Sequence, residues 1–276
     1  MLEKIVGSAP MFLLVAARCF ALIMSLPLFS SRTVSRLPKV ALAFYLAYFE
    51  FPLLSFNDGL FSPYLDYLSL DGKFTLEYVL LLAGEAMIGV IIGFYVNVIF
   101  AAFSTAGQFF AFQMGFAASS VYDSMSEVEN PLMGEFLNFL AMLVFLQTGL
   151  FRSLFTIGVG ASFRSLNVFS VLENSDRMAF FMMGGLTKLF HDAMIISLPL
   201  VATLFLVNVT VGILSKAAPQ MNLLAEGFPI LILSSFLILA FLLPHLIGFF
   251  EASFRHGFQD LQTLFSQVGY QIGGGQ

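Results

Sequence analysis

The sequence predicts an all-α protein of long apolar helices that lie in a membrane or inside a larger complex. Hydrophobic residues make up 59% of the 276 residues and charged residues only 11%, whereas about a quarter of a soluble domain is charged. The apolar residues fall in six runs of roughly helix length, separated by turn-forming segments. Polar side chains recur inside several runs, which indicates that protein covers much of this apolar surface.

The first apolar run reaches Phe29 and contains Arg18 and Cys19. No clear small-residue cleavage site follows it, so we expect this run to be retained rather than removed as a signal peptide. An arginine facing lipid costs a few kcal/mol, so Arg18 is expected to face protein or to reach toward water. The single Cys19 cannot form an intrachain disulfide and is interpreted as a small buried hydrophobic residue.

The second run, Val40 to Phe56, is short and is interrupted by Glu50 and Pro52. It barely reaches the length that crosses a bilayer. A basic turn precedes this run, and a turn-rich connection from Asn57 to Lys73 follows it.

The third run, Phe74 to Phe103, is the longest and holds Glu85, Gly89 and Gly93 on one helical face. Glycines spaced by four residues let a neighbouring helix approach closely. A carboxylate on that face is costly unless it is protonated or paired. We therefore predict that Glu85 is buried with a hydrogen-bond or ion-pair partner, and a functional role for it remains an equal alternative.

The segment from Ser104 to Pro131 is expected to be an irregular hydrophobic loop that turns acidic before Pro131. Its first half crowds aromatic and methionine side chains around Gly107 and Gly115, and these glycines are expected to permit unusual backbone angles. The residues of interest are Phe109, Phe110, Phe112, Gln113, Met114, Gly115 and Phe116. On the residues alone, the alternative is a helix end capped by a hydrophobic loop that packs on its own core.

The remaining apolar runs are Leu132 to Leu150, Ala193 to Leu214 and Phe228 to Phe250. A mixed, basic segment separates the first from the second. Between the last two, Pro219 is expected to end the incoming helix, Gln220 to lie in the turn, and Asn222 can cap the outgoing helix. This pattern predicts a tight helical hairpin.

Catalytic, metal and nucleic-acid functions find little support in the sequence. The net charge is −5 and no basic run is present, which argues against nucleic acid. Phosphate-binding, dinucleotide and metalloprotease motifs are absent, so no catalytic residue, metal site or cofactor is expected. His191 and Asp192 form the one tempting acid–base pair, and no nucleophile motif accompanies them.

Three stretches resemble the FliR/SctT family of flagellar and type III export-gate proteins. They are Gly84-Glu-Ala-Met-Ile-Gly-Val-Ile-Ile-Gly93, then Ala106-Gly-Gln-Phe-Phe-Ala-Phe-Gln-Met-Gly-Phe-Ala117 followed by Asp123 and Pro131, and lastly Leu214-Ser-Lys-Ala-Ala-Pro-Gln-Met-Asn222 with Gly227-Phe-Pro229. Their order and spacing extend the resemblance over nearly the whole chain. Within the family, the sequence resembles the flagellar FliR proteins most.

The resemblance implies a division of the chain. Residues 1–185 are then a helical part similar to FliP, including a plug loop at 106–119. Residues 186–265 are a helical hairpin similar to FliQ, and residues 266–276 are a flexible tail. In this family the loop closes the central channel of the gate, so Phe109 to Ser119 is expected to act as a plug.

The resemblance also implies partners and a location. One copy is expected to assemble with several FliP-like and FliQ-like subunits, and with FlhB-like and FlhA-like export proteins, to pass unfolded substrates. The expected location is the bacterial inner membrane within the flagellar basal body, with much of the chain held above the membrane plane.

Two other function classes stay open at this stage. A small-solute transporter would need a polar site near the middle of the membrane, for which Glu85 and Asn97 are candidates. An intramembrane enzyme would need a convergent acid–base group such as His191 with Asp192.

Overall fold

The computed structural model describes residues 8–30, 35–56, 59–67, 75–115, 132–218 and 227–269. Every secondary-structure element in these ranges is helical, which confirms the all-α prediction. The elements are α2 (Ala9–Ser25), α3 (Pro27–Ser30), α4 (Arg36–Glu50), η1 (Phe51–Leu53), η2 (Ser62–Tyr67), α5 (Leu76–Gln113), α7 (Leu132–Gln147), α8 (Leu150–Ser153), η3 (Leu154–Ala161), α9 (Ser162–Ser165), α10 (Val168–Glu173), α11 (Ser175–Ala217) and α12 (Phe228–Val268).

Among the described helices, α5, α11 and α12 are long and apolar enough to cross a membrane. The segments α7 and α8–α9, joined at a break, form a possible fourth candidate. The break contains Gly149, whose φ of 73° is in the left-handed region that favours glycine. The first two apolar runs become α2 and α4, which are 17 and 15 residues long. Both are shorter than the roughly 20 residues that a bilayer core requires.

The chain divides by its contacts into two compact units. Unit 1 comprises residues 1–98, 149–185 and 255–276, and unit 2 comprises residues 99–148 and 186–254. The helices α5, α11 and α12 each contribute residues to both units. The division implied by the family resemblance, with its boundary after residue 185, stays a prediction.

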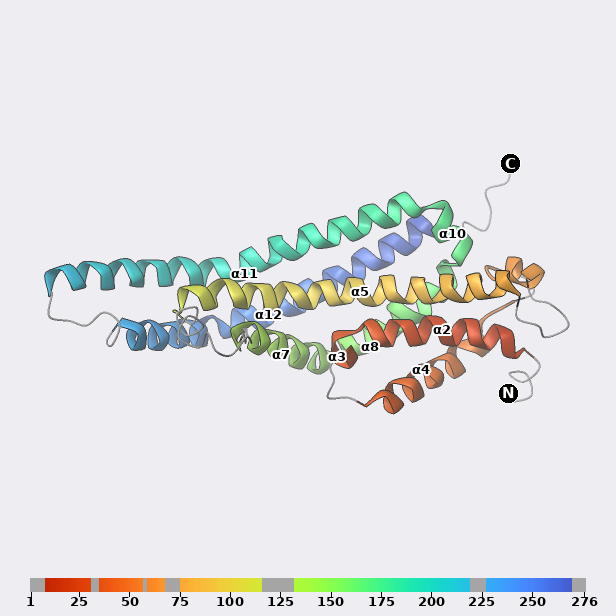
Figure 1. Ribbon diagram of the computed structural model, residues 1–276, viewed down its shortest axis with the longest axis horizontal. Helices are drawn as coiled ribbons and strands as arrows, with labels where there is room; N and C mark the ends of the chain where they lie inside the picture. The colour runs from red at the N-terminus through yellow and green to blue at the C-terminus, as the bar shows by residue number, and fades with distance from the viewer. Residues whose placement is uncertain are drawn as a thin grey trace. The chain divides into compact units, whose positions relative to one another are not determined.

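Unit 1 is organised around α2. Helix α4 lies beside it (Figure 1) and buries its small residues Ala43 and Ala47 completely. On α5, a side chain at Gly89 would overlap the Arg18 carbonyl of α2, and one at Gly93 would meet Leu22 and Ser25. These two glycines therefore let α5 approach the α2 backbone, as the small-residue spacing predicted.

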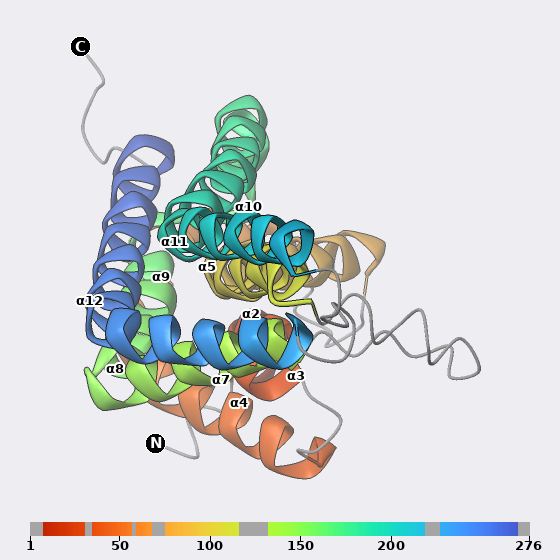
Figure 2. The same cartoon turned by 90° about the vertical axis from the view of Figure 1, so that its left-hand side faces the viewer.

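Unit 2 has an aromatic core. Its buried rings are Phe100, Phe103, Phe145, Phe250 and Phe254. Their centroids lie 4.3–5.5 Å apart in tilted and edge-on pairs, the arrangement that aromatic pairs prefer. These contacts join α5, α7 and α12, and α7 lies beside the N-terminal part of α12 in Figures 1 and 2.

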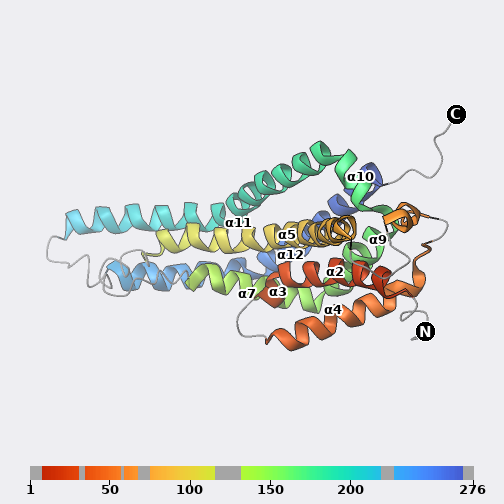
Figure 3. The same cartoon turned by 45° about the vertical axis from the view of Figure 1, so that its right-hand side comes forward.

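Within unit 2, α11 and α12 run in opposite directions (Figures 1 and 3). Ser253 of α12 donates a hydrogen bond of 2.9 Å to Asp192 of α11. Helix α11 ends at Ala217 and α12 begins at Phe228. The predicted turn residues Pro219, Gln220 and Asn222 lie outside the described residues.

The expectation of an irregular loop from Ser104 onward is wrong for its first part. Helix α5 continues to Gln113, because the apolar residues there follow helical spacing. Phe103, Ala106, Phe110 and Met114 recur every three or four residues, and all four are buried. Gly107 is therefore a packing residue, which faces the backbone of Met133 and Gly134 in α7.

Candidate functional site

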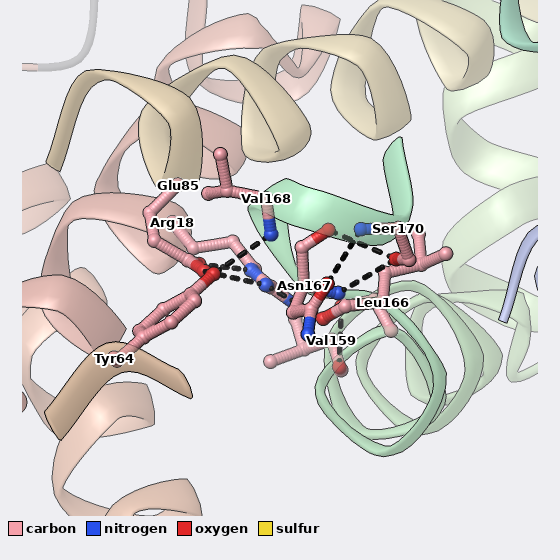
Figure 4. Close-up of polar contacts among 9 residues, drawn as sticks. Arg18, Tyr64, Glu85, Val159, Leu166, Asn167, Val168 and Ser170 are labelled. Atoms are coloured by element: carbon pink, nitrogen blue, oxygen red, sulfur yellow. Dashed lines mark hydrogen bonds and ion pairs between the residues drawn. The ribbon is translucent and has the colours of Figure 1, made fainter. Parts of the chain in front are cut away.

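A buried ion pair connects α2 with α5 in unit 1 (Figure 4). The Arg18 guanidinium donates from Nε to Glu85 Oε2 at 2.6 Å and from Nη2 to Glu85 Oε1 at 2.9 Å. Both side chains are 1% exposed. The predicted burial and pairing of Glu85 are thus confirmed, and Arg18 faces protein as expected.

Further hydrogen bonds bring two more chain segments to this pair. Tyr64 of η2 donates its hydroxyl to Glu85 Oε1 at 2.6 Å. The same hydroxyl accepts the backbone N–H of Val168 at 2.7 Å, and Arg18 Nη2 also donates to the Leu166 carbonyl at 2.9 Å. Burial and then the Glu85 carboxylate raise the pKa of Tyr64, so the phenol stays protonated and able to donate.

A second layer fixes the segment that supplies these backbone groups. The Asn167 side chain caps α10 by accepting a hydrogen bond from the Ser170 backbone N–H at 2.7 Å. In return, the Ser170 hydroxyl accepts a hydrogen bond from the Asn167 backbone N–H at 3.1 Å. Asn167 Nδ2 also donates to the Leu60 carbonyl at 2.8 Å. The capping box thus fixes the junction between α9 and α10, and the hydrogen bond to Leu60 ties this junction to the segment just before η2.

Aromatic rings complete the surroundings of the arginine. The Arg18 guanidinium carbon lies 4.3 Å from the ring centre of Phe163 and 5.8 Å from that of Phe61. Cation–π attraction of this kind grows when the cation is desolvated. The site therefore compensates a buried charge with one carboxylate, one backbone carbonyl and two rings.

The close approach at Gly89 holds α2 against α5 beside this pair, and this gives a direct prediction. Gly89→Ala should lower the free energy of unfolding by about 1–3 kcal/mol, because its methyl group overlaps the Arg18 carbonyl. Gly212→Ala in α11 meets no atom within 4 Å and should be neutral or slightly stabilising. Thermal unfolding of the complexes that co-purify with each variant chain in detergent measures both. Equal midpoints for the two variants would refute the packing role of Gly89.

A second, weaker charged contact lies in unit 1 between α4 and α9. Burial raises the pKa of Glu50, and the nearby Arg164 partly offsets this effect. Gly160 in the π-helix η3 lies beside both groups. Glu50 is thus a half-buried carboxyl whose charge is only partly compensated.

The predicted plug residues do not all share one environment. Phe110 and Met114 are buried in unit 2, whereas Phe112 is 71% exposed. Phe109 and Gln113 are half-buried, and Gly115 has a φ of 84°, so the left-handed conformation expected for it is confirmed. Phe116 lies outside the described residues.

The surroundings of His191 and Asp192, the candidate acid–base pair, do not resemble a catalytic site. The His191 side chain is 69% exposed and lies 3.3 Å from Asp192 Oδ1. The Ser253 hydroxyl donates to Asp192 Oδ2, so this serine is not aligned as a nucleophile toward the histidine. In the part of the chain that the structure describes, no three His, Cys, Asp or Glu side chains are placed to hold a metal ion.

The transporter hypothesis needs Glu85 to be available to a solute. Both of its carboxylate oxygens already accept hydrogen bonds, one from Arg18 Nε and the other from Arg18 Nη2 and Tyr64. Glu85 is also fully buried. A solute would have to displace the arginine, so this geometry does not favour a transport site.

Several residues of the site were not identified from the sequence. Tyr64 and Asn167 lie in segments with no apolar periodicity, and the pairing of Arg18 with Glu85 joins residues 67 apart. The available signal was an arginine within one apolar run and a glutamate in the middle of another, because charges placed inside apolar helices pair with each other.

Comparisons with known proteins were made for the whole chain. The family described as "Bacterial export proteins, family 1" matches residues 9–257. The chain is 29% identical over 270 residues to the flagellar biosynthetic protein FliR of Bacillus subtilis, covering 97% of the chain and 99% of that protein. It is 28% identical to FliR of Escherichia coli, covering 91% of each. It is also 29% identical over 155 residues to the surface presentation of antigens protein SpaR of Shigella flexneri, covering 55% of the chain and 58% of SpaR.

Proposed function

The chain belongs to the family of bacterial export proteins, family 1, and we infer that it is an export-gate component of the flagellar type III protein export apparatus. The observation that carries this inference is the similarity to flagellar FliR proteins along almost the full length of both chains. The chain is therefore a membrane protein of the export apparatus and not an enzyme.

The arrangement of the gate is a finer proposal. Residues 1–185 would pack like a FliP subunit and residues 186–265 like a FliQ hairpin, with one copy of the chain per complex. The exposed apolar side chains of α11 and α12, among them Leu206, Leu233 and Phe241, support this, because such surface must be covered by lipid or by partner subunits.

The plug segment, Phe109 to Ser119, would close the channel for unfolded substrates. The described part of this segment supports such a role. Phe110 and Met114 anchor the end of α5 in unit 2, while Phe112 projects its ring from the surface. The left-handed Gly115 then turns the chain out of the helix. Apolar rings can close a pore to ions by excluding water.

Purification tests the proposed assembly. The tagged chain, expressed with the rest of its export genes, should co-purify with FliP-like and FliQ-like subunits in a complex with one copy of this chain. Native mass measurement gives the subunit count, and export in a strain lacking the chain gives the activity. A chain that purifies alone, while remaining able to restore export, would contradict the proposal. FlhB-like and FlhA-like partners and an inner-membrane basal-body location are further expectations of the same proposal.

A further inference from the structure

The uncharged stretch of α11 contains one side-chain amide. Between Asp192 and Lys216 there is no charged residue, and Asn208 is the only asparagine or glutamine. Three hydroxyl groups there bond within the helix: Ser197 donates to the Met194 carbonyl, Thr203 to that of Pro199 and Thr210 to that of Leu206. Asn208 instead donates across to another helix.

The partner of Asn208 is the last residue of α5. Asn208 Nδ2 lies 3.3 Å from Gln113 Oε1 and 3.5 Å from the Gln113 backbone oxygen. The carbonyls of the last helical turn have no intrahelical donor, and the chain turns away at Gly115. Asn208 thus supplies a hydrogen bond that the end of α5 cannot make within its own helix.

The length of these hydrogen bonds matters for their role. Distances of 3.3 and 3.5 Å are longer than the usual 2.9–3.0 Å, so each bond is weak. Two weak bonds to one residue hold a helix end in place and still break at small cost. Phe110, three residues before Gln113, and Met114, directly after it, are buried in unit 2 and do not depend on these bonds.

We propose that Asn208 is a positioning residue of the gate, which holds the end of α5, from Phe109 to Gly115, in the closed arrangement. This inference rests on the proposed plug function of that segment. Breaking the Asn208–Gln113 contact loosens the exposed face of the last turn, which carries Phe112, while Phe110 and Met114 stay buried. This favours the open channel.

The test uses the assembled complex that co-purifies with the chain, reconstituted in lipid vesicles. Asn208→Leu should raise dye leakage about 3- to 10-fold, the range that one interhelical side-chain hydrogen bond in a membrane protein supports. Amide hydrogen exchange at residues 109–115 should accelerate by a similar factor. Asn208→Gln keeps an amide donor and should restore both values toward the wild type.

Two further variants separate a specific contact from a general loss of polarity. Thr210→Val removes a hydroxyl that bonds only within α11, and it should leave leakage unchanged. Gln113→Leu removes one acceptor but leaves the backbone oxygen, so its effect should be smaller than that of Asn208→Leu. Adding Gln113→Leu to Asn208→Leu should cause no further increase, because the two residues share one interaction.

Each outcome decides the proposal. Unchanged leakage and exchange in Asn208→Leu would overturn it, provided that a complex lacking Gly115 to Ser119 and carrying Phe112→Ser leaks. If that plug-deleted complex does not leak, the proposed plug function fails instead. Failure of both Asn208→Leu and the smaller Asn208→Ser to assemble would make Asn208 a folding residue and would also overturn the proposal.

Discussion

Replacing Glu85 with leucine should remove about 3–5 kcal/mol of stability and prevent assembly of the export complex. This is the usual cost of deleting one partner of a buried ion pair. It is a large fraction of the 5–15 kcal/mol by which most proteins are stable. Export and motility should be lost with it.

The cost arises mainly from what the substitution leaves behind. Without the carboxylate, the guanidinium of Arg18 keeps only the Leu166 carbonyl and two rings. Its Nη1 atom already has no hydrogen-bond partner. The Tyr64 hydroxyl would lose its acceptor as well. Two buried donor groups are then unsatisfied, and each is expensive in an apolar interior.

The controls distinguish this mechanism from a general intolerance to substitution. Arg18→Met combined with Glu85→Leu removes both charges and should recover much of the lost stability, as apolar replacements of whole buried pairs do. Glu135→Leu changes an exposed glutamate of α7 and should stay within about 0.5 kcal/mol of the wild type. Thermal unfolding in detergent and a motility assay give the two readouts. Normal motility in the Glu85→Leu strain would remove Glu85 from the site.

Removing the plug should raise ion and dye leakage on the order of tenfold or more while the complex still assembles, since an apolar constriction closes a pore by excluding water. The structure indicates where to cut. Deleting Gly115 to Ser119 and changing Phe112→Ser removes the expected closing groups but leaves the buried Phe110 and Met114 in place. Fluorescent dye release from reconstituted vesicles measures the leak.

The matched variant for this experiment is Phe110→Ala. Phe110 is 1% exposed, and its truncation should cost about 3–5 kcal/mol through the cavity that it leaves. That variant should therefore lose assembly without producing a leaky complex. An assembled plug-deleted complex with wild-type permeability, and with no other closed constriction, would contradict the plug function.

The sequence was informative where a residue conflicted with its surroundings. Arg18 and Glu85 are charged residues inside apolar runs. Gly89 and Gly93 are glycines inside a helix, and their four-residue spacing puts them on one face, where a neighbouring helix can pack closely. These conflicts predicted burial and pairing correctly. Spacing within one helix does not specify which distant residue supplies the partner, so the contributions of Tyr64 and Leu166 needed the structure.

The end of α5 shows the opposite case. The dense aromatic residues from Phe109 to Phe112 suggested an irregular loop, yet the helix continues because its buried residues keep a three- and four-residue spacing. The number of aromatic residues in a segment does not indicate a helix, whereas the three- and four-residue spacing of these residues does. Asn208 gave no signal at all, since an amide in an apolar helix can face any of several neighbours.

The Arg18–Glu85 pair also imposes an order on biosynthesis. Glu85 follows Arg18 by 67 residues and Leu166 follows it by 148. At roughly 5–20 residues per second, the ribosome delivers the carboxylate several seconds after the arginine, and the Leu166 carbonyl later still. A nascent chain that ends before Glu85 therefore carries an uncompensated cation in its first apolar helix. Helix α2 reaches its final environment only after more than half of the chain has been translated.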